Sequence, residues 1–293
     1  MLDATSHVVW SKLLSHRCRG FSRLEHTPSA FSAACRSEVP YIEVDTRVSS
    51  DGEVFVYHDP YTTPHMTQAC AFASTPAAAL RSLRYTDGEK LLTLQEAVEI
   101  FAKRKREDQA LCIDIKDFGF EQEHIRLVEA AGISDHVYFV SWIPQTLVEI
   151  HRLAPRFPLI LSHWNLLRSG LIGRAACRAV AHSLLRVFQF VVVGRERYKA
   201  PLRSLSHGFQ HAYFCGKLPA ELATMLSHTG GGIGVHLSCV SDRLLDYCVA
   251  ERLQLWVFSV GTGPEFLHYA CRDGVDVVFC DNATVALQHR SGV

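Results

Sequence analysis

The sequence lacks a net charge and long hydrophobic runs. Its 293 residues contain 30 Lys and Arg against 30 Asp and Glu, so the formal net charge is zero. A neutral chain has no overall attraction for a phosphate backbone, and we expect no nucleic-acid partner. No uninterrupted apolar stretch approaches the roughly 20 residues that cross a bilayer.

A leader pattern and paired cysteine motifs are also missing. The first residues, MLDATSHVVW, contain Asp3 and no long apolar stretch, so we expect no secretory signal peptide. The ten cysteines include no CxxC pair, which gives no indication of a zinc site. They lie in apolar segments, as buried free thiols of a reducing compartment do. We therefore expect an intracellular protein, cytoplasmic or peripherally membrane-associated, and not secreted.

Short apolar, β-branched runs recur along the chain and predict eight strands. They are Lys12–His16, Tyr41–Asp45, Leu111–Lys116, Val137–Ser141, Leu159–Ser162, Gly232–Leu237, Leu255–Val260 and Val277–Asp281. Helical patterns separate them, for example at 93–105 and 145–153. Eight strands alternating with helices predict an α/β fold, a (β/α)8 TIM barrel in which residues 1–293 form a single domain.

One connection is much longer than the others. Residues 166–231 separate the fifth and sixth predicted strands, far more than such connections usually need. Its first part, 166–203, has eight basic residues against the single acid Glu196, a net charge of +7, and interleaved apolar residues. This composition is typical of a basic amphipathic segment on an anionic membrane surface. The alternative is a pair of barrel helices with a solvated basic face.

Charged residues stand at the carboxyl ends of the predicted strands, where barrel enzymes place their chemistry. His16 ends the first, Glu43 and Asp45 the second, and Asp114 and Lys116 the third. Within each pair the spacing of two places both side chains on one face of the strand. Two charges on a core strand are costly unless they are paired or bind a ligand.

These residue types suit the cleavage of a phosphodiester. The reaction needs a base for the nucleophile, an acid for the leaving oxygen and positive charge on the phosphoryl oxygens. Two histidines, His16 and His58, can share the acid and base roles near neutral pH. Three carboxylates suit one hard divalent cation such as Mg²⁺ or Ca²⁺. Arg17 and Lys116 could hold the phosphate oxygens.

A purely structural explanation is also open. Glu43 and Asp45 could pair with Arg17 and Arg47 in a salt-bridge cluster, and Lys116 could simply neutralise Asp114. The order of all these residues on successive strand ends favours the functional interpretation.

Several segments together resemble the glycerophosphodiester phosphodiesterase family. They are HRCRG at 16–20, EHT at 25–27, IEVD at 42–45, DGEVFVYHD at 51–59, LTLQEA at 92–97, CIDIK at 112–116 and GVD at 274–276 with Asp281. The resemblance runs from about residue 12 to 283 and is more specific in the first half. It implies a (β/α)8 barrel and the hydrolysis of glycerophosphodiesters with a divalent metal.

The resemblance also implies a role for each matching residue. His16 and His58 become the catalytic acid and base, and Arg17 and Lys116 bind phosphate. The implied metal ligands are Glu43, Asp45 and Asp114. Glu25 becomes an acid that contacts these residues without itself binding the metal or the phosphate. Trp256 and Phe258 are expected at the substrate-facing rim.

Some positions depart from the family pattern. Cys18 replaces the Gly after His-Arg, His26 replaces Asn, and Phe258 replaces Trp. Asp114 replaces the common Glu, as it does in a membrane-associated branch that includes lysophospholipase D enzymes and a fungal phosphatidylglycerol phospholipase C. That branch tends to carry a long apolar or basic insertion after its fifth strand, which 166–203 resembles.

Three functions follow as hypotheses. The first is a lysophospholipase D or glycerophosphodiesterase that releases a head-group alcohol from a glycerophosphodiester or (lyso)phospholipid at a membrane surface. The second is a phospholipase C acting on an anionic lipid such as phosphatidylglycerol. The third is a catalytically inactive lipid-binding barrel, for which five intact acid, base and metal-ligand positions would be unnecessary.

Overall fold

Eight parallel strands form a closed barrel in the computed structural model, which describes residues 9–62, 65–163, 217–261 and 264–291. The barrel strands are β1 Leu13–Ser15, β2 Tyr41–Val48, β4 Ala110–Ile115, β5 Val137–Ser141, β6 Leu159–His163, β7 Gly232–His236, β8 Gln254–Val260 and β9 Val277–Cys280. Each pairs in parallel with the next, and β1 pairs with both β2 and β9, which closes the ring. The predicted (β/α)8 barrel is confirmed.

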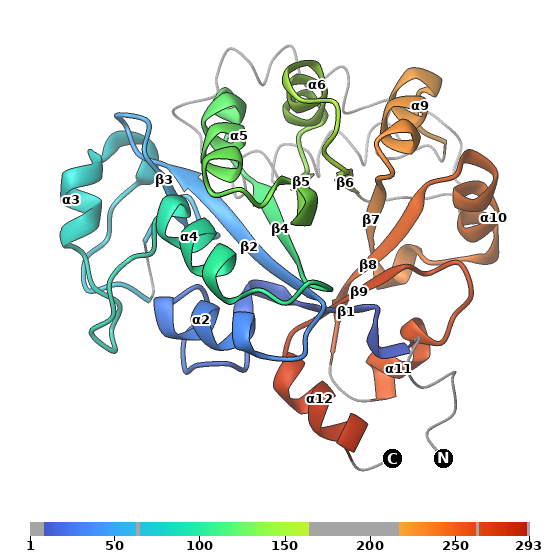
Figure 1. The fold of residues 1–293 in the computed structure, drawn as a ribbon, viewed down its shortest axis with the longest axis horizontal. Coiled ribbons are helices and arrows are strands. Elements are labelled where there is room, and N and C mark those ends of the chain that lie inside the picture. The colour runs from blue at the N-terminus through green and yellow to red at the C-terminus, as the bar shows by residue number, and fades with distance from the viewer. Residues whose placement is uncertain (1–8, 63–64, 164–216, 262–263, 292–293) are drawn as a thin grey trace.

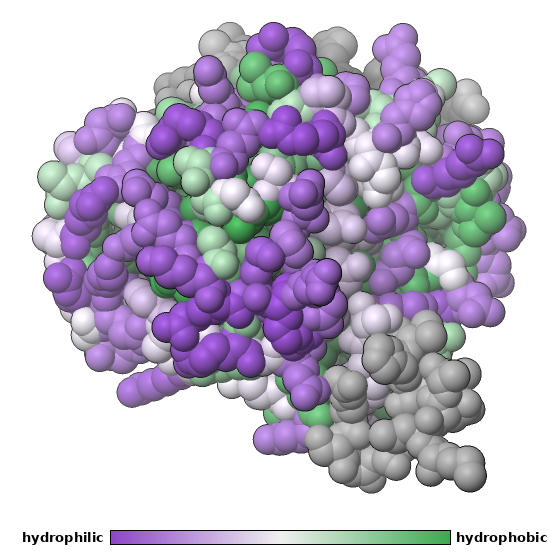
Figure 2. Space-filling view, viewed as in Figure 1, coloured by the Kyte–Doolittle hydropathy of each residue, from purple (hydrophilic) through white to green (hydrophobic). Residues whose placement is uncertain are grey.

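Helices surround the barrel, as Figure 1 shows. They are α2 Pro28–Arg36, α4 Leu94–Arg104, α5 Glu121–Ala130, α6 Pro144–Leu153, α9 Ala220–His228, α10 Asp242–Glu251, α11 Pro264–Ala270 and α12 Ala283–Ser291, with short 3-10 turns at His16–Cys18, Ser134–His136 and Leu237–Cys239. Each presents an apolar stripe to the strands; α4 buries Leu94, Ala97, Val98 and Phe101. The face seen in Figure 2, over α2 and α4, is largely hydrophilic, as expected for outer helix surfaces.

The start of α4 is fixed by a capping box. The Thr93 hydroxyl accepts the Glu96 N–H at 3.2 Å, and the Glu96 carboxylate accepts the Thr93 N–H at 3.1 Å. We expect Thr93→Ala to lower the free energy of unfolding by about 1 kcal/mol, because it removes one acceptor from the first helical turn. Urea denaturation measures the loss. Thr93→Ser, which keeps the hydroxyl, should retain most of the stability, and an equal loss in both variants would contradict the capping explanation.

Two apolar layers hold the barrel. One lies between the strands and the helices, and the other fills the barrel interior. The interior layer consists of Leu14, Cys112, Val140, Ile160, Trp256, Val277 and Phe279. Of the eight described cysteines, all free thiols, six are buried, so the prediction of buried thiols is confirmed for these six.

A ninth strand and a second small core were not predicted. Strand β3, Val54–Val56, pairs antiparallel with the end of β2 and is followed by a 3-10 turn at Phe72–Ser74 and α3, Ala77–Ser82. Figure 1 shows β3 and α3 beside the barrel. Apolar side chains between 55 and 91 pack together there. The β3 hairpin returns the chain to β2, where the Tyr57 N–H donates to the Asp45 carbonyl at 3.0 Å, and so brings His58 to the barrel.

The long basic segment predicted at 166–203 lies outside the described residues. Within the part of the chain that the structure describes, no helix has the length and apolar character needed to span a membrane.

A buried histidine makes the fold sensitive to acid. His124 is fully buried; its Nδ1–H donates to the Phe120 carbonyl at 2.8 Å and its Nε2 accepts the Thr46 hydroxyl at 2.9 Å. Burial lowers the pKa of His124 to about 4 from its usual 6.5. Between these values the unfolded chain binds a proton that the folded chain does not.

We therefore expect stability to fall as the pH drops from 6.5 toward 4, with His124 contributing up to about 1.4 kcal/mol per pH unit and no further loss below its folded pKa. Urea denaturation of the wild type and of His124→Gln at pH 7 and pH 5 tests this. The variant should lose less stability between the two pH values than the wild type. An identical loss would show that His124 does not contribute.

Candidate active site

A polar cavity of about 190 Å³ lies at the carboxyl ends of the barrel strands. Its lining brings together all seven residues predicted to act on the phosphate, the protons or the metal: His16, Arg17, Glu43, Asp45, His58, Asp114 and Lys116. Parallel pairing explains this, because Asp45 on β2 is in register with Asp114 on β4, and β1 lies on the other side of β2. Trp142, Ser162, Phe258, Ser259 and Phe279 complete the lining.

Asp45 lies between two cations. Its Oδ1 is 2.8 Å from the Lys116 Nζ, and its Oδ2 is 3.1 Å from the Arg17 Nε. Burial acts to raise the pKa of Asp45, but Lys116, His58 and Arg17 outweigh it and hold the pKa well below its usual range. Lys116 also donates to Asp114 Oδ2 at 2.5 Å. The ion pairs of the structural explanation are therefore partly present, although Arg47 pairs elsewhere, with Asp117.

The cluster has more carboxyl groups than cationic partners. Glu43, Asp45 and Asp114 share the site with only two cationic side chains among its lining residues. Burial, followed by the charges of Asp45 and Asp114, raises the pKa of Glu43 well above its usual value. Burial also raises the pKa of Asp114 to about 6. Such a cluster is the arrangement that a bound cation would relieve.

The donor atoms fit a hard divalent cation. Asp114 Oδ1 is buried and has no hydrogen-bond partner, so it is available as a ligand. Glu43 uses one oxygen, Oε2, to accept the Arg17 N–H at 2.8 Å. Among the described residues, the group whose possible ligand atoms all lie within 4.8 Å of one another is His26, Glu43 and Asp45, so this group contains His26 in place of the predicted Asp114. The His26 Nε2 accepts the Asp45 N–H at 3.3 Å, a bond that His26 would have to give up to bind a cation.

Both histidines are oriented by carboxylates that sequence reasoning left without a role. His16 Nδ1 lies 2.6 Å from Asp281 Oδ1, and His58 Nδ1 lies 2.6 Å from Asp59 Oδ1. An ionised carboxylate only accepts, so Nδ1 carries the proton and Nε2 is the nitrogen free for chemistry. These hydrogen bonds lower the pKa of both aspartates. The adjacency of Asp59 to His58, and the position of Asp281 at the end of β9, were the available signals.

Burial favours the neutral forms of both histidines in the absence of substrate. It lowers the pKa of His16 and lowers that of His58 to about 4. An anionic phosphodiester bound beside them would favour their charged forms and so raise both pKa values.

Glu25 contacts two arginines of the 16–20 segment, one of which, Arg17, contacts Asp45. Its carboxylate is 2.5 Å from the Arg19 Nε and 3.3 Å from the Arg17 Nη1. Arg19 in turn reaches Asp281 at 2.8 Å. Glu25 therefore fixes the arginines of the 16–20 segment, and Arg19 links it to the carboxylate that orients His16.

The backbone conformation of Cys18 shows the structural cost of one departure from the family pattern. Cys18 has φ +55°, in the left-handed region that glycine adopts without cost. The family's glycine at this position is therefore suited to the turn, and Cys18 holds the same conformation with some strain. Gly20 remains glycine because a Cβ there would lie 2.2 Å from the Asn282 Oδ1.

The two aromatic residues predicted at the rim differ in position. Phe258 lines the cavity and packs edge-on against Trp142, with ring centroids 5.2 Å apart. Trp256 does not reach the rim: it is fully buried in the barrel interior, where it contacts Tyr41 and Tyr138. Both side chains are on the inner face of β8, but Trp256 lies one side-chain layer deeper.

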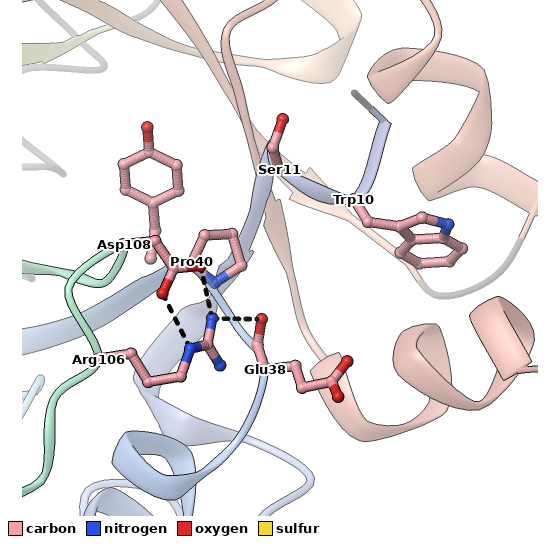
Figure 3. Close-up of a pocket in the computed structure, with 7 residues that line it drawn as sticks. Trp10, Ser11, Glu38, Pro40, Arg106 and Asp108 are labelled. Carbon is pink, nitrogen blue, oxygen red and sulfur yellow. Dashed lines mark hydrogen bonds and ion pairs between the residues drawn. The ribbon is translucent and has the colours of Figure 1, made fainter. Parts of the chain in front are cut away.

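A larger cavity of about 530 Å³ lies at the opposite, amino-terminal end of the strands (Figure 3). Its charged groups pair with one another: Arg106 binds Asp108 at 2.9 Å and also the backbone carbonyls of Ser37 and Glu38. No acid–base pair or carboxylate cluster lines it. Functional groups of barrel enzymes gather at the other end, so the smaller cavity is the candidate active site.

The fold and the cavity define a class: a (β/α)8 barrel with histidine, carboxyl and cationic side chains gathered at the carboxyl ends of its strands. The model of the glycerophosphoryl diester phosphodiesterase family matches residues 16–165, slightly more than half of the chain. The chain belongs to this family and is, on that ground, a phosphoric diester hydrolase. No curated protein sequence gives a significant match.

Solved structures share the whole fold. A protein assigned as a glycerophosphoryl diester phosphodiesterase from Agrobacterium tumefaciens is 17% identical, with a TM-score of 0.67 over 96% of this chain and 97% of that one. One from Silicibacter pomeroyi is 14% identical, with a TM-score of 0.69 over 96% of this chain and 93% of that one. An Oleispira antarctica phosphodiesterase, solved with the product sn-glycerol-3-phosphate, is 17% identical, with a TM-score of 0.64 over 98% of this chain and 99% of that one. At these identities the likeness concerns the fold.

Proposed function

We propose that this chain hydrolyses glycerophosphodiesters at the cavity, with His16 and His58 as acid and base. The observation that carries the proposal is the convergence of these histidines, Arg17, Lys116 and three carboxylates in one buried cavity. The product complex of the Oleispira antarctica protein supports a glycerol-linked substrate.

Each group has a distinct part in the reaction. Arg17 and Lys116 bind the non-bridging phosphoryl oxygens and offset the charge that develops on them. One histidine takes a proton through Nε2 from the nucleophile, either water or a neighbouring glycerol hydroxyl. The other donates a proton to the leaving oxygen, while Asp59 and Asp281 hold the two rings in place.

Glu43, Asp45 and Asp114 would hold one divalent cation, Mg²⁺ or Ca²⁺, whose ligands are oxygens. When bound, the cation polarises the phosphoryl group and offsets developing negative charge. The raised pKa of Glu43, which a bound cation would lower, and the unpartnered Asp114 oxygen support this assignment.

We further propose that the substrate is a lysophospholipid or glycerophospholipid at a membrane surface, as in a lysophospholipase D. Two features support this: Asp114 stands where most of the family has Glu, and 166–203 has a net charge of +7 with interleaved apolar residues. Electrostatic attraction to anionic lipid contributes about 1 kcal/mol per basic residue near the surface.

The decisive experiment is a panel of soluble glycerophosphodiesters, lysolipids and diacyl lipids, with Mg²⁺ and Ca²⁺ titrated and the phosphate-bearing product identified by mass. A free head-group alcohol supports the lysophospholipase D type. Diacylglycerol with a phosphorylated head group supports the phospholipase C alternative. If no diester is hydrolysed with either metal, the result supports the third hypothesis, a catalytically inactive lipid-binding barrel.

Membrane contact has its own test. Replacing Arg174, Arg178 and Arg186 with glutamine should weaken binding to vesicles containing phosphatidylserine while leaving turnover of a soluble diester unchanged. The matched control replaces three exposed, ion-paired arginines of α5 and α6 and the following loop, Arg126, Arg152 and Arg156. Equal binding by wild type and variant would contradict contact through this segment.

A further inference from the structure

Arg47 is a third charged residue on the same face of β2 as Glu43 and Asp45. Alternation along the strand places positions 43, 45 and 47 on one side. Its side chain is 1% exposed, yet Arg47 is not among the residues that line the cavity. A buried guanidinium is costly unless its hydrogen bonds are used, so its partners indicate its role.

The guanidinium joins two segments that carry site residues. Its Nε–H donates to the His58 carbonyl at 2.8 Å, and its Nη1–H donates to Asp117 Oδ1 at 3.1 Å. Asp117 Oδ2 accepts the Val48 N–H at 2.8 Å, which fixes the carboxylate against β2. Asp117 directly follows Lys116, at the end of β4.

His58, unlike Glu43, Asp45 and Asp114, does not lie on a barrel strand. It is carried by the loop after β3, a strand of only three residues outside the closed ring. One hydrogen bond holds the backbone on its amino side, from the Tyr57 N–H to the Asp45 carbonyl at 3.0 Å. The bond from Arg47 holds the carbonyl of His58 itself.

We propose that Arg47 is a positioning residue: its guanidinium, anchored on Asp117, sets where the His58 ring stands relative to Asp45. This inference rests on the proposed function and adds a residue to it. Arg47 acts through the backbone of His58 and does not bind the phosphate. A misplacement of about 1 Å in a catalytic group can cost as much as 10²-fold in rate.

The test removes both charges together, in Arg47→Met with Asp117→Asn, because either one left alone would be buried and unpaired. We expect kcat to fall about 10- to 100-fold while KM stays within twofold. The matched control is the exposed pair Arg81 and Glu53, changed to Met and Gln, whose kcat should not change. A loss confined to KM would overturn the proposal, because it would place Arg47 in substrate binding.

A second measurement does not depend on activity. The ¹⁵N spectrum of the histidine rings reports which ring nitrogen carries the proton, and the His58→Gln variant assigns the His58 signals. In the wild type His58 should show a single tautomer with Nδ1 protonated. In the double variant its signals should be averaged between the two tautomers. An unchanged His58 spectrum and kcat in a folded double variant would overturn the proposal. Absence of phosphodiesterase activity in the wild type would defeat the proposed function, whereas the spectra would still test Arg47.

If the double variant does not fold, Arg47→Lys replaces it. Lysine keeps a positive charge opposite Asp117 but lacks the planar fork that reaches two acceptors at once. We expect a smaller fall in kcat with the same change in the His58 spectrum. Wild-type kcat and an unchanged His58 spectrum in Arg47→Lys would overturn the proposal.

Discussion

Replacing His16 or His58 with alanine is expected to lower kcat by roughly 10²- to 10⁴-fold, the usual contribution of a positioned acid or base. Each ring lines the cavity, and each is oriented by a carboxylate 2.6 Å from its Nδ1. Removing both histidines should cost less than the sum of the two single effects, because acid and base act in one step. Initial rates on the preferred diester, at saturating substrate and metal, measure the loss.

The control for these variants is His228→Ala. His228 is exposed at the end of α9, far in sequence from the cavity residues, and its replacement should leave kcat unchanged. Thermal melting must show that both active-site variants remain folded. Near-normal turnover by purified His16→Ala or His58→Ala would remove that residue from the mechanism.

Removing the divalent cation is expected to abolish activity and to expose repulsion among the carboxylates. Without a cation, Glu43 is buried beside Asp45 and Asp114, and its pKa is raised well above the usual value. Glu43→Gln should therefore inactivate the protein and yet raise the melting temperature of the metal-free form. In the wild type, by contrast, added Mg²⁺ or Ca²⁺ at 100 times its Kd should stabilise the fold by about 2.7 kcal/mol.

Thermal melts of both proteins, with chelator and with each metal, separate the two effects. The variant should show a smaller metal-induced shift than the wild type, because it retains only two of the three proposed carboxylate ligands. Glu53→Gln, a partly exposed acid paired with Arg81, serves as the control and should keep the wild-type metal response. Full activity in chelator, or equal metal shifts in wild type and Glu43→Gln, would exclude these carboxylates as the metal site.

Much of the barrel and the cavity could be predicted because the signals were local. Glu43 and Asp45 are two residues apart on one strand, and parallel pairing then places them beside Asp114. The eight barrel strands were recognisable because buried parallel strands are continuous apolar runs. The phosphate-binding and acid–base groups follow from residue types at strand ends.

What sequence reasoning missed depends on contacts between distant residues or on depth in the barrel. The hydrogen bond from His16 to Asp281 spans 265 residues; the position of Asp281 at a strand end does not show which residue it contacts. Alternation along β8 places Trp256 and Phe258 on one face, but only the packing of Trp256 against Tyr41 and Tyr138 shows which side chain is deeper. Strand β3 has three residues and pairs antiparallel with the end of β2, so it lies outside the repeat of strand and helix that predicts the barrel.

The partnership of His16 with Asp281 also has a consequence for how the protein matures. Asp281 is made 265 residues after His16, and β1 meets β9 only when the ring closes. A nascent chain that still lacks its final strand can assemble much of the carboxylate cluster but not an oriented His16. Hydrolytic competence should therefore appear only after β9 has joined β1, so recovery of turnover during refolding reports completion of the barrel rather than early collapse.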